Sequence, residues 1–227
     1  MVAKGEVAAV GIAPPSWWER LKDVVAPLLR NRIAMVGLLL VLFWVVVAIG
    51  APLLTHYGPY EELPGVVNQG PSAAHWLGTD NKGRDLWARV AYGSRTIMVL
   101  APLSVLCSLL IGATLGLLAG YHGGWVDDLV MRVVDIIMAF PAVLLYLIII
   151  AAVGASSVNV VIAITVAGAP GVARLVRGLT LDIRTREYVA AAKLRGESAW
   201  HIMFVEILPN ARGPIIVDAA LRIGYAV

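Results

Sequence analysis

The sequence predicts an all-α, polytopic transmembrane helical bundle with four complete spans and an incomplete fifth. Of its 227 residues, 59% are hydrophobic and only 15% are charged, and the mean hydropathy is +0.82. Soluble domains rarely combine so much apolar and so little charged sequence. Residues 33–54 and 97–120 also carry no charge, and each segment is long enough to cross a hydrocarbon core of about 30 Å as a helix.

The first half of the chain has three predicted parts. Residues 1–32 form a cytoplasmic N-terminal segment, in which Trp17, Leu21, Val24 and Leu28 recur at helical spacing and predict an amphipathic helix at the membrane interface. Residues 33–54 are the first span, and 32 residues precede it, which is unlike a cleaved signal peptide. Residues 55–96 form an extracytoplasmic loop with an amphipathic surface helix around Trp87.

Residues 97–227 are predicted to form the transmembrane domain proper, with a cytoplasmic loop at 174–212. Residues 136–173 are uncharged over 38 residues, which would be about 57 Å as one helix, too long for a single crossing. The cluster Gly-Ala-Ser-Ser at 154–157 divides them into two antiparallel spans. A further apolar segment starts near Gly213 and holds Asp218 and Arg222, which should pair with one another. Its 15 residues are short of a crossing, so we expect the chain to be a fragment or a truncated product.

The basic residues predict the orientation. Thirteen Lys and Arg residues lie in the N-terminal segment, the loop near Arg132 and residues 174–212, against four in the alternate segments. Because positive residues accumulate on the cytoplasmic side, the N-terminus and the 174–212 loop are placed in the cytoplasm. The basic excess therefore reflects the topology of the chain in the lipid bilayer, and we expect no nucleic-acid partner.

The sequence lacks the usual motifs of nucleotide and metal chemistry. It has no G-x-x-x-x-G-K-[ST] and no H-E-x-x-H, so we predict no cofactor and no catalytic residue. The four histidines are spread over separate loops, and the single Cys107 excludes an internal disulfide framework. Two alternatives stay open: an integral-membrane enzyme with a metal at Asp127, Asp128 and Asp135, and an ATP-independent channel. Against the metal, Asp128 can pair with Arg132 at i, i+4.

The stretch "EYVAAAKLRGESAWHIMFVEILPN", residues 187–210, is unusual between two apolar segments. Three alanines favour a short helix over residues 186–195, and Gly196 is placed to end it. A second amphipathic helix should carry Trp200 and Phe204 and be closed by Pro209. The small alanine face would let another protein approach closely; the alternative is a solvated loop that only joins two spans.

The sequence "AAAKLRG" followed by "EILPN" resembles the cytoplasmic loop of ABC-importer permeases, whose pattern is Glu-Ala-Ala, three residues, Gly, nine residues, then Ile-x-Leu-Pro. Ala190 stands where the pattern has Glu, and Glu206 stands where it has Ile. The resemblance implies that this loop docks on a separate ATPase subunit. The residues that it assigns to the coupling loop are Glu187, Tyr188, Ala191, Ala192, Gly196, Leu208 and Pro209.

Two further stretches resemble the dipeptide, oligopeptide and nickel group of these permeases. One is "HWLGTDNKGRDLWARVAYGSR", and the other is "GGWVDDLVMRVVDIIMAFP". The first contains the extracytoplasmic motif residues Gly78, Thr79, Asp80, Gly83, Arg84, Asp85, Arg89, Gly93 and Arg95. Their charged side chains either contact a binding protein or are merely solvated or paired.

The resemblance implies a permease subunit of an ATP-driven importer in the inner membrane. Its cargo would be peptides or related small solutes such as nickel complexes. The expected partners are two ABC ATPase subunits, a second homologous permease subunit and an extracytoplasmic substrate-binding protein. The chain itself would not be an enzyme, because ATP hydrolysis takes place on the partner subunits.

Overall fold

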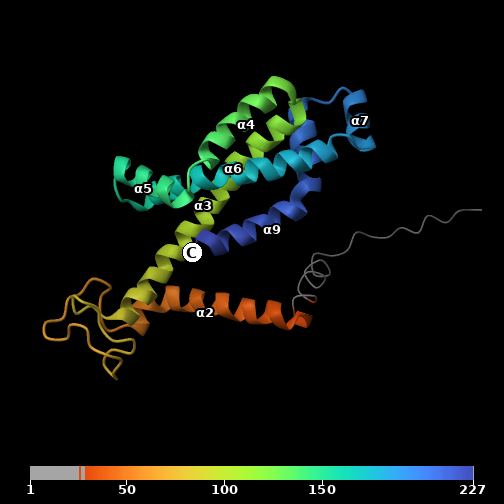
Figure 1. Cartoon of the computed structure of the whole chain (residues 1–227). Coiled ribbons are helices and arrows are strands. Elements are labelled where there is room, and N and C mark those ends of the chain that lie inside the picture. The colour runs from red at the N-terminus through yellow and green to blue at the C-terminus, as the bar shows by residue number, and fades with distance from the viewer. Residues whose placement is uncertain (1–25, 27–28, 227) are drawn as a thin grey trace, which may run out of the picture. The chain divides into compact units, whose positions relative to one another are not determined.

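The computed structural model describes residue 26 and residues 29–226 of the chain, and it is almost entirely helical (Figure 1). The four positions that predict an interfacial helix, Trp17, Leu21, Val24 and Leu28, lie outside the described residues. Within the described residues the only β-type pairing is an isolated bridge between Thr79 and Asp85. The chain divides into two compact units, one ending at Ser94 and one starting at Arg95.

The first unit is built on helix α2, Arg32–Leu54, which matches the first predicted span. Asn31 caps it, because its Oδ1 accepts hydrogen bonds from the backbone N–H groups of Ile33 and Ala34. A small buried cluster of Val47, Ala51 and Ala91 ties the end of α2 to the start of the next helix. Most other large apolar side chains of α2 are exposed, as expected of a helix that faces lipid.

Helix α3, Leu86–His122, runs unbroken for 37 residues. The predicted surface helix around Trp87 and the predicted second span are therefore one helix, and the boundary drawn at residue 96 lies inside it. Gly93 is the only strong breaking signal in between, and one glycine costs a helix only about 1 kcal/mol relative to alanine. Ser94 fits within the helix by donating its hydroxyl to the Ala91 carbonyl at 2.7 Å.

The predicted third span is not a single straight helix. Helix α4, Gly124–Met138, and helix α5, Ala142–Val153, meet at a bend of 87°. Pro141 is the N-cap of α5, and a proline pushes the residue before it out of helical geometry. Because α5 has only 12 residues, it is about 18 Å long and cannot cross a bilayer alone.

Helix α6, Ser157–Ile183, begins where the sequence predicted a division. Ser156 caps it by accepting the backbone N–H of Asn159 at 3.2 Å. Among the described residues, α2, α3 and α6 are long and apolar enough to span a membrane, and the α4–α5 pair adds a fourth crossing if it counts as one broken span. The structure therefore has the four predicted spans only if α4 and α5 together count as one span.

The segment after α6 forms helix α7, Glu187–Leu194, then α8, Ala199–His201, a π-helical turn η1, Ile202–Ile207, and α9, Leu208–Ala226. The expectation that Pro209 closes a helix is wrong, since α9 runs through it. The wide π turn explains this: Leu208 already donates to the Met203 carbonyl, one residue further back than in an α-helix. The series of backbone hydrogen bonds is thus shifted by one residue just before Pro209, which has no N–H group to donate.

The second unit depends on a close contact between α3 and α6, which cross in Figure 1. Gly112, Gly116 and Gly120 recur every four residues on one side of α3 and lie against the backbone of α6. A Cβ atom at Gly116 would lie 2.5 Å from the Ala173 carbonyl oxygen. Small residues at this spacing let helix backbones approach in membranes. The four-residue spacing of these glycines is visible in the sequence, but the contact was not among the features predicted from it.

Replacing Gly116 with alanine should therefore destabilise the second unit by about 1–3 kcal/mol, because the added methyl group forces α3 and α6 apart. Thermal unfolding of the purified chain in detergent measures this. The matched control is Gly178→Ala in α6, where a Cβ meets nothing within 4 Å; it should be neutral or stabilising by up to about 1 kcal/mol. Equal melting temperatures for the two variants would contradict the close-contact account.

Candidate functional site

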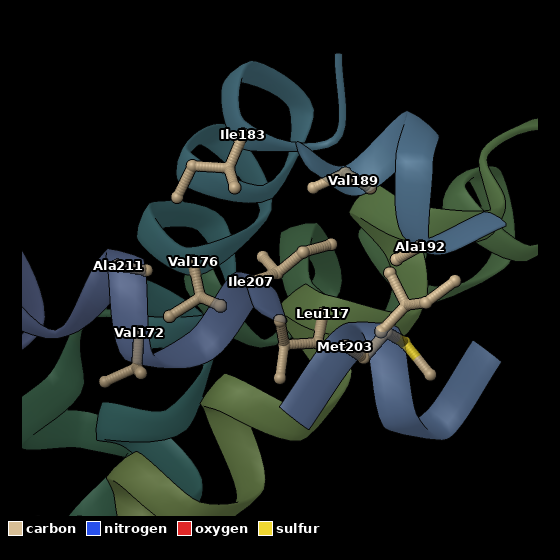
Figure 2. Close-up of a cluster of buried hydrophobic side chains, with 10 residues drawn as sticks. Leu117, Val172, Val176, Ile183, Val189, Ala192, Met203, Ile207 and Ala211 are labelled. Atoms are coloured by element: carbon tan, nitrogen blue, oxygen red, sulfur yellow. The ribbon is translucent and has the colours of Figure 1, made fainter. Parts of the chain in front are cut away.

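The segment from α7 to η1 packs onto the ends of α3 and α6. Val189 and Ala192 of α7 are fully buried in a cluster that also contains Leu117 of α3 and Val176 of α6. The η1 turn contributes Met203 and Ile207 to the same cluster, which Figure 2 shows from within. Burial of each large apolar side chain stabilises the folded state by about 1.5–3 kcal/mol. The segment is thus a folded part of the second unit, which excludes the alternative of a merely solvated loop.

Polar contacts fasten the same segment to the C-terminal end of α3. Arg184 donates from Nη1 to the carbonyl oxygens of Gly120 at 2.7 Å and Tyr121 at 3.3 Å. These are carbonyls of the last turn, which lack partners within the helix. The Lys193 ammonium group lies 5.3 Å from the centre of the Tyr121 ring, within cation–π range. The end of α3 is therefore held by a residue before α7 and by a residue inside it.

The turn after α7 has the geometry that the sequence predicted. Gly196 has a φ of +78°, a left-handed conformation that favours glycine. The backbone N–H of Gly196 donates to Lys193, and that of Glu197 donates to Ala192, each to the carbonyl oxygen. This pair of hydrogen bonds is a Schellman motif, so Gly196 ends α7 and reverses the chain toward α8.

One face of α7 points away from the core. We call it the outer face of α7, and it consists of Glu187, Ala190, Ala191 and Leu194, all exposed. The Leu194 side chain is 90% exposed, which the sequence analysis missed although the helical spacing places it beside the alanines.

The predicted coupling residues divide between this face and the core. Glu187, Ala191, Gly196 and Pro209 are exposed, and Tyr188 and Leu208 are half-buried. Ala192 was expected to contact a partner, but it is fully buried. Its small size serves the packing of α7 onto the cluster, and it is not available to another protein.

A charged group lies beside the outer face. Glu197, His201 and Glu206 bring their ligand atoms within 4.8 Å of one another, which is a possible metal arrangement. Arg195, however, pairs through Nη2 with Glu197 at 2.7 Å and with Glu206 at 3.6 Å. His201 Nε2 also lies 2.9 Å from Glu197. Because both carboxylates already have partners within the group, we interpret it as an ion-pair network that links the turn after α7 to η1.

The aspartates of α4 are paired with α6. Asp127 accepts two hydrogen bonds of 2.5 Å from the Arg177 guanidinium, and Asp135 accepts one of 2.6 Å from Arg174. The predicted pair between Asp128 and Arg132 is not among the ion pairs of the described residues. Arginines from the facing helix take two of the three carboxylates, which weakens the case for a metal at this position.

The extracytoplasmic motif is a folded loop organised by Asp80. Its Oδ1 accepts the backbone N–H groups of Lys82 at 2.8 Å and Arg84 at 3.0 Å, and its Oδ2 lies 2.6 Å from Arg89 Nη1. The hydrogen bond from the Arg84 backbone is the main reason that the pKa of Asp80 lies below its ordinary value. The Asp80 carboxylate is thus ionised, and both of its oxygens are bound by groups of the loop and of the start of α3.

The other motif residues also serve the loop or the start of α3. Gly78 and Gly83 have φ values of +81° and +72°, and a Cβ at either would lie within 2.5 Å of a backbone carbonyl oxygen. The hydroxyl group of Thr79 donates to the Val66 carbonyl.

Asp85 caps the start of α3, because its Oδ1 accepts the backbone N–H of Ala88 at 2.7 Å. Its Oδ2 lies 2.9 Å from Nδ1 of the buried His75. Gly93 lies within α3, and Arg95 is exposed. The geometry therefore favours pairing within the loop for the motif carboxylates over contact with another protein.

Comparison with known proteins identifies the family. Residues 112–227 match the family described as "Binding-protein-dependent transport system inner membrane component". The chain belongs to this family. Residues 19–71 also match the "N-terminal TM domain of oligopeptide transport permease C".

Three relatives of this permease family illustrate the similarity. A dipeptide transport system permease protein of Alkalihalophilus pseudofirmus is 43% identical over 93% of the chain and 68% of its own length. A glutathione transport system permease protein of Pectobacterium atrosepticum is 40% identical over 88% of the chain and 66% of its own length. An oligopeptide transport system permease protein of Bacillus subtilis is 32% identical over 91% of the chain and 68% of its own length. The chain spans about two thirds of the length of these relatives.

Membership of the permease family confirms the resemblance drawn from the three motifs. It also confirms an all-helical membrane protein of the binding-protein-dependent transport class. A transport family with apolar spanning helices speaks against the enzyme alternative.

Proposed function

We propose that this chain is a permease subunit of an ATP-driven importer that carries peptides or related small solutes, such as nickel complexes, through the inner membrane. The observation that carries the proposal is the outer face of α7, a small-residue surface presented by a helix that is fixed to the ends of α3 and α6. The relatives named as dipeptide, oligopeptide and glutathione permeases support a peptide cargo.

The proposed partners are those that the permease family implies in general. Two ABC ATPase subunits bind at the cytoplasmic side, one of them on the outer face of α7. A second homologous permease subunit completes the pathway, and an extracytoplasmic binding protein delivers the solute. The exposed Leu194 provides the apolar contact in this docking site, and the alanines beside it permit close approach.

The mechanism passes force through the contacts of α7. When the ATPase subunits close on ATP, they displace α7, which is linked to α3 through Arg184 and Lys193. Val189 and Ala192 are packed in one cluster with residues of both α3 and α6. The two helices therefore move with α7, and the pathway switches from outward-facing to inward-facing. The chain makes no covalent change in the solute. An ATP-independent channel is the remaining alternative, and uptake that persists without ATP would favour it.

A charge placed on the outer face of α7 should abolish docking. We expect Ala191→Arg and Leu194→Asp to leave the protein in the membrane and to reduce the amount of ATPase that co-purifies with it at least tenfold, because each change buries an unpaired charge in the contact. Quantitative co-purification from native membranes measures the effect.

The matched control for docking is His122→Arg, which adds a charge at an exposed position outside α7. It should retain the ATPase at the wild-type level. Ala192→Leu should act differently again, by lowering the melting temperature of the chain, because Ala192 is fully buried. Wild-type ATPase recovery with both outer-face variants would show that the contact lies elsewhere.

The proposed orientation can be tested by labelling. In a Cys107→Ser background, single cysteines at Asn68, His122 and Glu197 report on three loops. An impermeant thiol reagent applied to intact cells should label only position 68, since the N-terminus and the α7 segment are proposed to lie in the cytoplasm. Labelling of position 197 in sealed cells would place the docking face on the wrong side.

A further inference from the structure

A charged side chain lines a cavity among the apolar helices of the second unit. The cavity has a volume of about 300 Å³, is partly open, and is lined by residues of α3, α5, α6 and α9. Its walls are mostly aliphatic, and its polar lining comes from Ser108, Tyr146, Arg222 and Tyr225. Such a combination of apolar walls and a few convergent polar groups is typical of small-molecule sites.

Arg222 is seated by features of both α9 and α6. Its Nε donates to Asp218 Oδ2 at 2.5 Å, which confirms the predicted i, i+4 pair, and its Nη1 donates to the Gly168 carbonyl oxygen at 3.3 Å. The guanidinium group lies so close to Gly171 that a Cβ there would be 2.8 Å from Nη2. The glycines of α6 therefore leave room for a flat group to lie against the helix.

The seating leaves donors unused. A guanidinium group has five N–H donors in a fixed plane, and within residues 29–226 only Asp218 and the Gly168 carbonyl accept from Arg222. Three N–H groups, one on Nη1 and two on Nη2, thus have no acceptor among these residues, and the side chain is 26% exposed. Ionisable residues among apolar membrane helices are costly and are kept mainly where they line a solute or ion path.

We propose that Arg222 binds the carboxylate group of a transported solute within this cavity. A carboxylate is the ligand that fits best, because two parallel N–H groups of a guanidinium bind its two oxygens in one plane. Asp218 holds the guanidinium in place and keeps its unused edge available, and the aliphatic walls accommodate the remainder of the solute. This site deepens the proposed function, on which the identity of the solute as a peptide rests.

Binding of a labelled dipeptide tests the site. The probes are radiolabelled Ala-Ala and its C-terminal amide, measured by equilibrium dialysis against the purified chain in lipid nanodiscs. Wild type should bind the free acid more tightly than the amide. Arg222→Gln should weaken binding of the acid roughly tenfold or more and should change binding of the amide by no more than about twofold.

Asp218→Asn is the variant that separates ligand binding from a structural ion pair. If Arg222 binds the solute, Asp218→Asn keeps or strengthens binding of the acid, because asparagine retains an oxygen that can accept from Arg222 Nε but no longer carries the negative charge that competes with the solute carboxylate. If the pair only stabilises α9, Arg222→Gln and Asp218→Asn lower binding of acid and amide alike, and the proposal is wrong. Equal affinity of wild type for acid and amide, or no binding of either, would also overturn it.

Gel filtration of each variant as a single peak at the wild-type position checks that the fold is kept. The measurement needs neither ATPase nor binding protein. Its failure therefore leaves the proposed transport function standing, and loss of ATP-dependent uptake leaves the binding result standing.

Discussion

The close approach of α3 and α6 is the contact on which the second unit depends. Gly112, Gly116 and Gly120 bring the two backbones together, and α4, α5 and α9 all pack against α6. Helix α4 is fixed to α6 through Asp127 and Arg177, and α7 packs across the ends of both helices. Within the bilayer, apolar side chains gain little by moving from lipid into a helix interface. Close packing of this kind and hydrogen bonds between helices therefore supply most of the free energy of helix association.

The same contact connects the two proposed sites. The outer face of α7 lies at one end of α6, and the cavity around Arg222 is lined by Gly168 and Ile164 nearer its middle. Because α6 carries both Val176, which packs against the α7 segment, and the carbonyl that receives Arg222, a displacement of α7 has a direct route to the cavity. Pro170 lies between these two regions of α6, where a missing backbone hydrogen bond makes bending easier.

Much of the fold was predictable because single residues or runs decide it. The uncharged run at 33–54, the division at residues 154–157 and the helix-ending Gly196 act locally, and all were predicted from the sequence. The offset that lets α9 pass Pro209 depends on a π turn, which no local pattern announced. The bend between α4 and α5 and the burial of Ala192 depend on which faces meet in the folded chain. The contacts of Arg222 with Gly168 and Gly171 became visible only once α6 and α9 were placed. The position of Leu194 beside the alanines, by contrast, follows from helical spacing and was predictable.

The central claim is that the α7 segment is one folded body with the ends of α3 and α6. Hydrogen–deuterium exchange of the chain in lipid nanodiscs tests it most directly. The amides of α7 and η1 should exchange in the same cooperative step as those of the C-terminal half of α6, since they share one buried cluster. Rapid exchange of α7 while α6 stays protected would contradict the claim, because a loop that opens independently could not pass force to the helices.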